Sequence, residues 1–106
     1  FFLQRIFGMT GKQVVDGTIT MVGFEQITSL SSSAGLTVPT GATMALIQAE
    51  DQNVRWRPDG SSTAPTASVG IVLEAGKDIF YTSDLSALRF IEEATSAKLN
   101  VAFYDA

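Results

Sequence analysis

The stretch that most constrains the fold is KLNVAFY, residues 98–104, because apolar and other side chains alternate along it with a period of two. That period is the one by which a β-strand sends successive side chains to opposite faces of a sheet. One face of this strand would carry Leu99, Val101 and Phe103, and the other Asn100, Ala102 and Tyr104. We therefore expect a strand with one face in a hydrophobic core.

Similar short stretches recur along the chain, separated by turn signals such as Pro39-Thr40-Gly41 and Pro58-Asp59-Gly60. Short strands at this regular spacing predict a small antiparallel β-sandwich or barrel, an all-β fold. The expected strands are 24–30, 43–49, 54–57, 68–73, 78–82, 87–92 and 98–104.

Alternation also assigns faces to the first two of these strands. In residues 24–30, one face would hold Phe24, Gln26, Thr28 and Leu30, and the other Glu25, Ile27 and Ser29. In residues 43–49, Met44, Leu46 and Gln48 would oppose Ala45, Ile47 and Ala49. Residues 85–94 also contain good helix formers after a capping Ser83 or Asp84, so a helix is the alternative there. We expect at most one helical turn, at residues 83–86, before the strand.

The first 22 residues lack a sustained period and contain Gly8, Gly11 and Gly17, so we expect an extended arm with at most one strand, at residues 17–22. Residues 23–106 would form the single β-domain. The arm carries large apolar side chains, and each forgoes roughly 1.5 to 3 kcal/mol if it stays exposed. The arm should therefore be covered by its own sheet or by a neighbouring subunit. The side chains concerned are Phe1, Phe2, Ile6 and Phe7.

Composition excludes several kinds of chemistry. The chain has no cysteine and no histidine, which removes thiolate sites, Ser-His-Asp catalysis and His-rich metal sites. Its net charge of −4 argues against nucleic-acid binding, which normally needs a basic face. No apolar run approaches the roughly 20 residues that cross a bilayer. We therefore expect no enzyme activity, no cofactor, no metal and no membrane insertion.

Arg55, Trp56, Arg57 and Asp59 form the most conspicuous candidate site. Trp56 could anchor an interface, where tryptophan and arginine are enriched, or stack on a sugar. Alternatively, Trp56 is a core residue and the arginines pair with nearby acids, of which the sequence offers Glu50, Asp51 and Asp59.

The other charged residues give weaker evidence of a functional site. Asp51, Asp59, Asp78 and Asp84 lie at expected turns without calcium-loop spacing, and turn formation accounts for them. Adjacent residues on a strand point to opposite faces, so Glu92 and Glu93 cannot flank one substrate. Arg89 is either a half-buried residue paired with a carboxylate or a contact to another subunit.

Three stretches, LTVPTGATMALIQAEDQNVRWRPDG, PTASVGIVLEAG and DLSALRFIEEATSAKLNVAFYD, resemble segments of small virion structural proteins of tailed bacteriophages. They cover roughly the last seventy residues. The resemblance implies a jelly-roll-like β-sandwich, assembled in the host cytoplasm, that decorates or cements a capsid.

In that interpretation the chain forms a homo-oligomer and binds the major capsid protein or other virion proteins. Its contacts would come from Phe1, Phe2, Ile6, Phe7, Arg55, Arg57, Asp59 and Arg89. A ring in the tail or neck is the alternative location. A carbohydrate-binding module using Trp56, Tyr81 or Tyr104 is a third hypothesis.

Overall fold

A computed structural model describes residues 19–60 and 64–106 of the chain. The described residues form an all-β fold with one short 3-10 helix, η1 (Leu85–Ala87). The strands are β1 (Thr20–Ile27), β2 (Met44–Glu50), β3 (Val54–Arg57), β4 (Ile71–Leu73), β5 (Asp78–Tyr81), β6 (Arg89–Glu92) and β7 (Lys98–Asp105).

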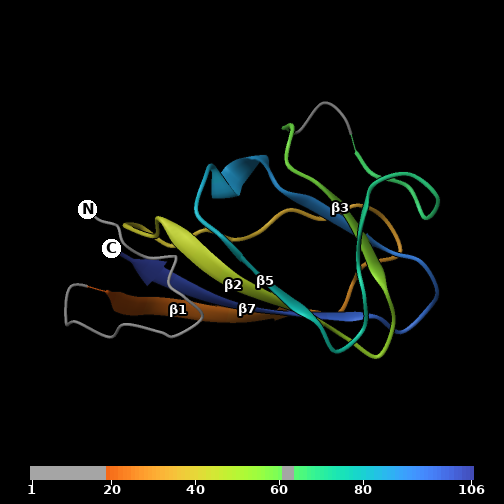
Figure 1. Ribbon diagram of the computed structural model, residues 1–106, viewed down its shortest axis with the longest axis horizontal. Helices are drawn as coiled ribbons and strands as arrows, with labels where there is room; N and C mark the ends of the chain where they lie inside the picture. The colour runs from red at the N-terminus through yellow and green to blue at the C-terminus, as the bar shows by residue number, and fades with distance from the viewer. Residues whose placement is uncertain (1–18, 61–63) are drawn as a thin grey trace.

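The strands form two antiparallel sheets that pack face to face as a sandwich (Figure 1). The four-stranded sheet has the order β1-β7-β2-β5, and the three-stranded sheet has the order β4-β3-β6. The expected small antiparallel sandwich is therefore confirmed.

The strand pairs are nested in the chain. The first strand pairs with the last (β1 with β7), Ala34 pairs with Phe90 of β6, β2 pairs with β5, and β3 pairs with β4. Successive pairs alternate between the two sheets, which is the connectivity of a jelly roll. One strand position is reduced to a single bridge, in which the Ala34 and Phe90 amides each donate to the other residue's carbonyl, at 2.8 and 2.9 Å.

The core lies between the sheets and follows the period-two pattern of β2 and β7. Ala45, Ile47 and Ala49 are fully buried, as the alternation predicts. Their cross-strand partners Phe103, Val101 and Leu99 are also buried. The three-stranded sheet adds Val54, Leu73 and Phe90 from the other side. Because alternate residues of each central strand face the core, a shift of one residue in register would exchange the inner and outer faces of the strand.

β1 differs from the expected strand in extent and in side-chain orientation. It begins at Thr20, so residues 20–22, where the sequence allowed a strand at the end of the arm, form one continuous strand with residues 23–27. A register shift between Met21 and Gly23 interrupts its alternation. The strand ends at Ile27, and the chain then turns, so Leu30 is buried while Phe24 is exposed. The prediction that these two side chains share a face was wrong for that reason.

The last third of the chain contains the expected single helical turn. The Asp84 carboxylate caps η1 by accepting a hydrogen bond from the Ser86 amide at 3.0 Å. β4 is shorter than predicted because Gly70, with φ of 144°, interrupts extended backbone just before it. In the part of the chain that the structure describes, no helix is long and apolar enough to span a membrane.

Candidate interaction surface

Trp56 faces the space between the sheets. Its ring stacks on Phe90 with a centroid distance of 6.4 Å, and it meets Tyr81 edge to face at 6.0 Å. The indole N–H is buried and has no acceptor among the described residues. The half-buried Trp56 is thus a core residue, the simpler of the interpretations that the sequence allowed.

Arg55 lies on the opposite face of β3 and ties two loops to it. Its Nε donates to Glu93, and its Nη1 donates to the Gly70 carbonyl at 3.1 Å. The Glu93 carboxylate also accepts a hydrogen bond from Asn53 Nδ2 at 3.3 Å. These hydrogen bonds, the one from Arg55 above all, hold the pKa of Glu93 below its ordinary value of 4.5. Arg55 is therefore paired within the domain, and its partner Glu93 is not one of the three acids that the sequence analysis considered for this role.

Arg57 and Asp59 form a local pair at the end of β3. The guanidinium donates to both carboxylate oxygens, with Nε 3.2 Å from Oδ1. This confirms one of the three pairings considered from the sequence. Another candidate acid, Asp51, instead pairs with Lys98, Oδ2 to Nζ at 2.8 Å. That pair raises the pKa of Lys98 above its ordinary value.

Arg89 packs against the bridge segment, the residues around Ala34 that pair with β6. Its Nη1 donates to the carbonyls of Ser86 and Leu88, at 3.0 and 2.7 Å. Among the described residues no carboxylate pairs with it, so the carboxylate pairing, one of the two interpretations left open by the sequence, is not found there. A Cβ on Gly35 would lie 2.8 Å from Arg89 Nη1, which shows how closely the guanidinium meets the bridge segment.

The arginines nevertheless share one surface. Arg57 and Arg89 are cross-strand partners, and Arg55 lies two residues along β3, so all three lie on the outer face of the three-stranded sheet. Like charges directly opposite each other destabilise a sheet, and here each guanidinium is engaged by a carboxylate or by backbone carbonyls. The predicted arm residues Phe1, Phe2, Ile6 and Phe7 lie outside the described residues.

The outer face of the four-stranded sheet carries four of the seven large exposed apolar side chains of the described residues, and the other three, Val69, Ile71 and Val72, lie on or beside β4. One row crosses all four strands, from Phe24 through Ala102 and Leu46 to Phe80. Phe24 is 61% exposed, Phe80 54% and Leu46 37%. A second row runs from the exposed Met21 through the half-buried Tyr104 to Met44, which is buried, and Tyr104 meets Phe80 edge to face with centroids 6.1 Å apart. We call the seven residues of these two rows the apolar outer face.

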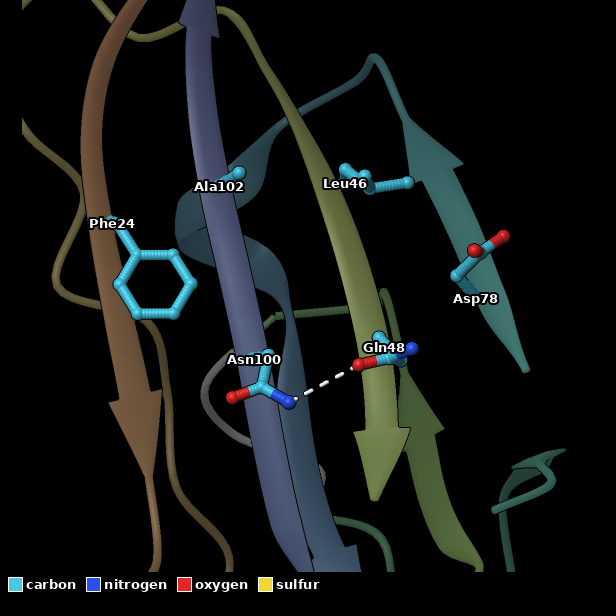
Figure 2. A pocket seen from close by; sticks show the side chains of 6 residues that line it. All are labelled: Phe24, Leu46, Gln48, Asp78, Asn100 and Ala102. Carbon is cyan, nitrogen blue, oxygen red and sulfur yellow. Dashed lines mark hydrogen bonds between the residues drawn. The ribbon is translucent and has the colours of Figure 1, made fainter. Parts of the chain in front are cut away.

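A row of polar side chains borders the apolar outer face. Gln26 donates to Asn100 at 2.8 Å, and Asn100 donates to Gln48 at 3.1 Å and to Glu50 at 2.9 Å. Asn100 and Gln48 line a hollow of about 210 Å³ together with Phe24, Leu46, Ala102 and Asp78, and Figure 2 shows these six side chains. This surface joins an open apolar area to an ordered row of amides.

Sequence reasoning did not identify this surface, although a signal was present. Residues 43–49 and 78–82 carry large apolar side chains on both faces, through Leu46 and Phe80 as well as the core positions. Strands that are apolar on both faces are typical of sheets covered on both sides. The prediction assigned Leu46 to a face, but it assigned no face to Phe80 and did not ask what would cover the second face of these strands.

The described residues do not assemble the alternative sites. Trp56 and Tyr81 lie between the sheets, and Tyr104 lies on the outer face of the four-stranded sheet, so the three rings do not line one groove. No cluster of three metal-ligating side chains occurs in residues 19–60 and 64–106.

Comparisons of the chain with family models, with curated proteins and with solved structures find no match.

Proposed function

We propose that this chain is a non-enzymatic structural protein of a phage virion, a jelly-roll module that decorates or cements the capsid across neighbouring major capsid subunits. The observation that carries the proposal is the apolar outer face. It leaves Phe24, Leu46 and Phe80 exposed on a regular sheet, and exposed apolar groups that lie together mark protein-binding surfaces. The sequence resemblance supplies the virion context.

The arrangement of the surface suits assembly rather than chemistry. Aromatic residues are favoured anchors in protein interfaces, and a surrounding polar rim is the usual anatomy of such contacts. Phe24, Phe80 and Tyr104 provide the aromatic groups, and the amide row ending at Asn100 and Gln48 provides a polar border. Both lie on strands rather than loops, so the surface is held in one shape.

The size of the surface bears on how a partner binds. Strands about 4.8 Å apart with about 3.3 Å per residue give the sheet a face of roughly 500 Å². A standard interface buries about 800 Å² on each partner. The apolar outer face would therefore need a second contact for tight binding, and a protein repeated over a lattice gains such contacts from its neighbours.

Quantitative mass spectrometry of purified virions tests the proposal. Cleavage after Lys77 and Arg89 releases the peptide DIFYTSDLSALR, which can be counted against peptides of the major capsid protein. We expect this chain in intact particles, at a copy number that scales with the capsid lattice. About a dozen copies would instead indicate a tail or neck ring, and absence from purified particles would overturn the virion assignment.

A further inference from the structure

We infer that the apolar outer face is the docking site for the chain's own N-terminal segment, residues 1–7. This inference rests on the proposed function, because it treats the face as a protein-binding surface. It adds that residues 1–7 are the polypeptide that binds there. The segment FFLQRIF contains Phe1, Phe2, Leu3, Ile6 and Phe7. The apolar segment and the apolar sheet face each forgo the favourable free energy of burial while they remain exposed to water.

The chain's connectivity places the segment within reach. β1 begins at Thr20 on an edge strand of the same sheet, and Met21 of the apolar outer face is its next residue. Residues 8–19 connect the two and include Gly8, Gly11 and Gly17, whose backbones permit reversal of direction. Twelve extended residues span about 40 Å, which exceeds the roughly 20 Å across the sheet.

The length and charge of the N-terminal segment also match those of the sheet face. Seven extended residues span about 23 Å, close to the length of the sheet face. A second folded copy would find only roughly 500 Å² there, less than the 800 Å² that a standard interface takes from each partner. The first 18 residues carry Arg5, Lys12 and Asp16, whereas the rest of the chain has five basic and ten acidic residues. The segment therefore brings one positive charge, Arg5, to a domain of net negative charge, and Asp78 is among the residues that line the hollow.

Docking also explains why aromatic side chains lie on this outer face, because the docked segment covers them. Within one chain the segment is tethered, so binding does not incur the translational cost that a separate partner meets. The same contact can form between neighbouring copies, because an exchanged segment meets an identical face. Such exchange would link subunits on a lattice without any new surface.

Disulfide trapping tests the contact in the chain of residues 1–106, which contains no cysteine. One variant combines Gln4→Cys with Ala102→Cys, which lies in the middle of the apolar outer face (Figure 2). Its matched control combines Gln4→Cys with Val72→Cys, an exposed position on the three-stranded sheet. Trp56 is the only tryptophan, and its fluorescence reports whether each variant is folded.

We expect the Ala102 variant to form its disulfide at least tenfold faster than the Val72 control under the same oxidant, and the difference to disappear in denaturant. A cross-linked monomer shows docking within one chain, and a cross-linked dimer shows the same docking between copies. Adding Phe2→Asp and Phe7→Asp should reduce the rate to that of the control. Equal rates in the two folded cysteine pairs, or no effect of the aspartates, would overturn the inference. The proposed virion role is measured separately, in particles.

Discussion

At the scale of single residues, Arg55 and Glu93 make the clearest electrostatic contribution. Glu93 has a lowered pKa in the folded protein because Arg55 donates to its carboxylate. Its stabilising effect is therefore fully present above the ordinary value of 4.5 and is lost as pH falls through the lowered pKa. The pair ties β3 to the loop that follows β6.

Glu93→Gln should consequently reduce stability at neutral pH, with little difference from the unmodified protein in strong acid. Urea unfolding followed by Trp56 fluorescence at several pH values measures this. Glu74→Gln removes an exposed carboxylate from the turn before β5 and serves as the control. A Glu93→Gln effect that is as large in strong acid as at neutral pH would contradict the assigned role of the ion pair.

Gly35 and Arg89 provide a second test at this scale. Gly35→Ala places a Cβ against the guanidinium, which must move away from the carbonyls of Ser86 and Leu88. We expect a loss of about 1 kcal/mol, the typical net value of such hydrogen bonds. In an Arg89→Met background the same substitution should cost much less. Additive effects in this double-mutant cycle would show that the close approach does not matter.

At the scale of secondary-structure elements, the sequence predicted best where alternation is strict. Residues 98–104 alternate between apolar and other side chains, and alternation in residues 43–49 correctly grouped Ala45, Ile47 and Ala49 on one face, which is the core face in the structure. Alternation failed in β1, where the register shift near Gly23 and the strand's end at Ile27 change which residues face inward. Such local irregularities depend on pairing with a distant strand, and a short sequence window does not contain that information.

Ile47 tests the core role of β2. It is fully buried between the sheets, so Ile47→Ala should cost about 2 to 5 kcal/mol through lost burial and a residual cavity. Thr28→Ala, at an exposed position just beyond β1, should change stability by less than about 0.5 kcal/mol. Chemical denaturation measures both, and similar costs for the two substitutions would contradict the described packing.

At the scale of the whole molecule, partner choice was the hardest property to predict. The sequence singled out Arg55, Arg57 and Arg89, and each of their guanidinium groups is engaged within the described domain. Ion-pair partners such as Glu93 lie far along the chain, so spacing alone could not identify them. The apolar outer face comes from four separate strands, and only the sheet order brings its residues together.

The central claim is that this jelly roll is a virion component whose apolar outer face is covered by polypeptide in the assembled particle. A cryo-electron microscopy map of the intact particle tests it most directly. We predict the sandwich on the capsid surface, with polypeptide packed over Phe24, Leu46 and Phe80. A map in which the sandwich is present with this face bare to solvent, or in which the protein has no place, would contradict the account.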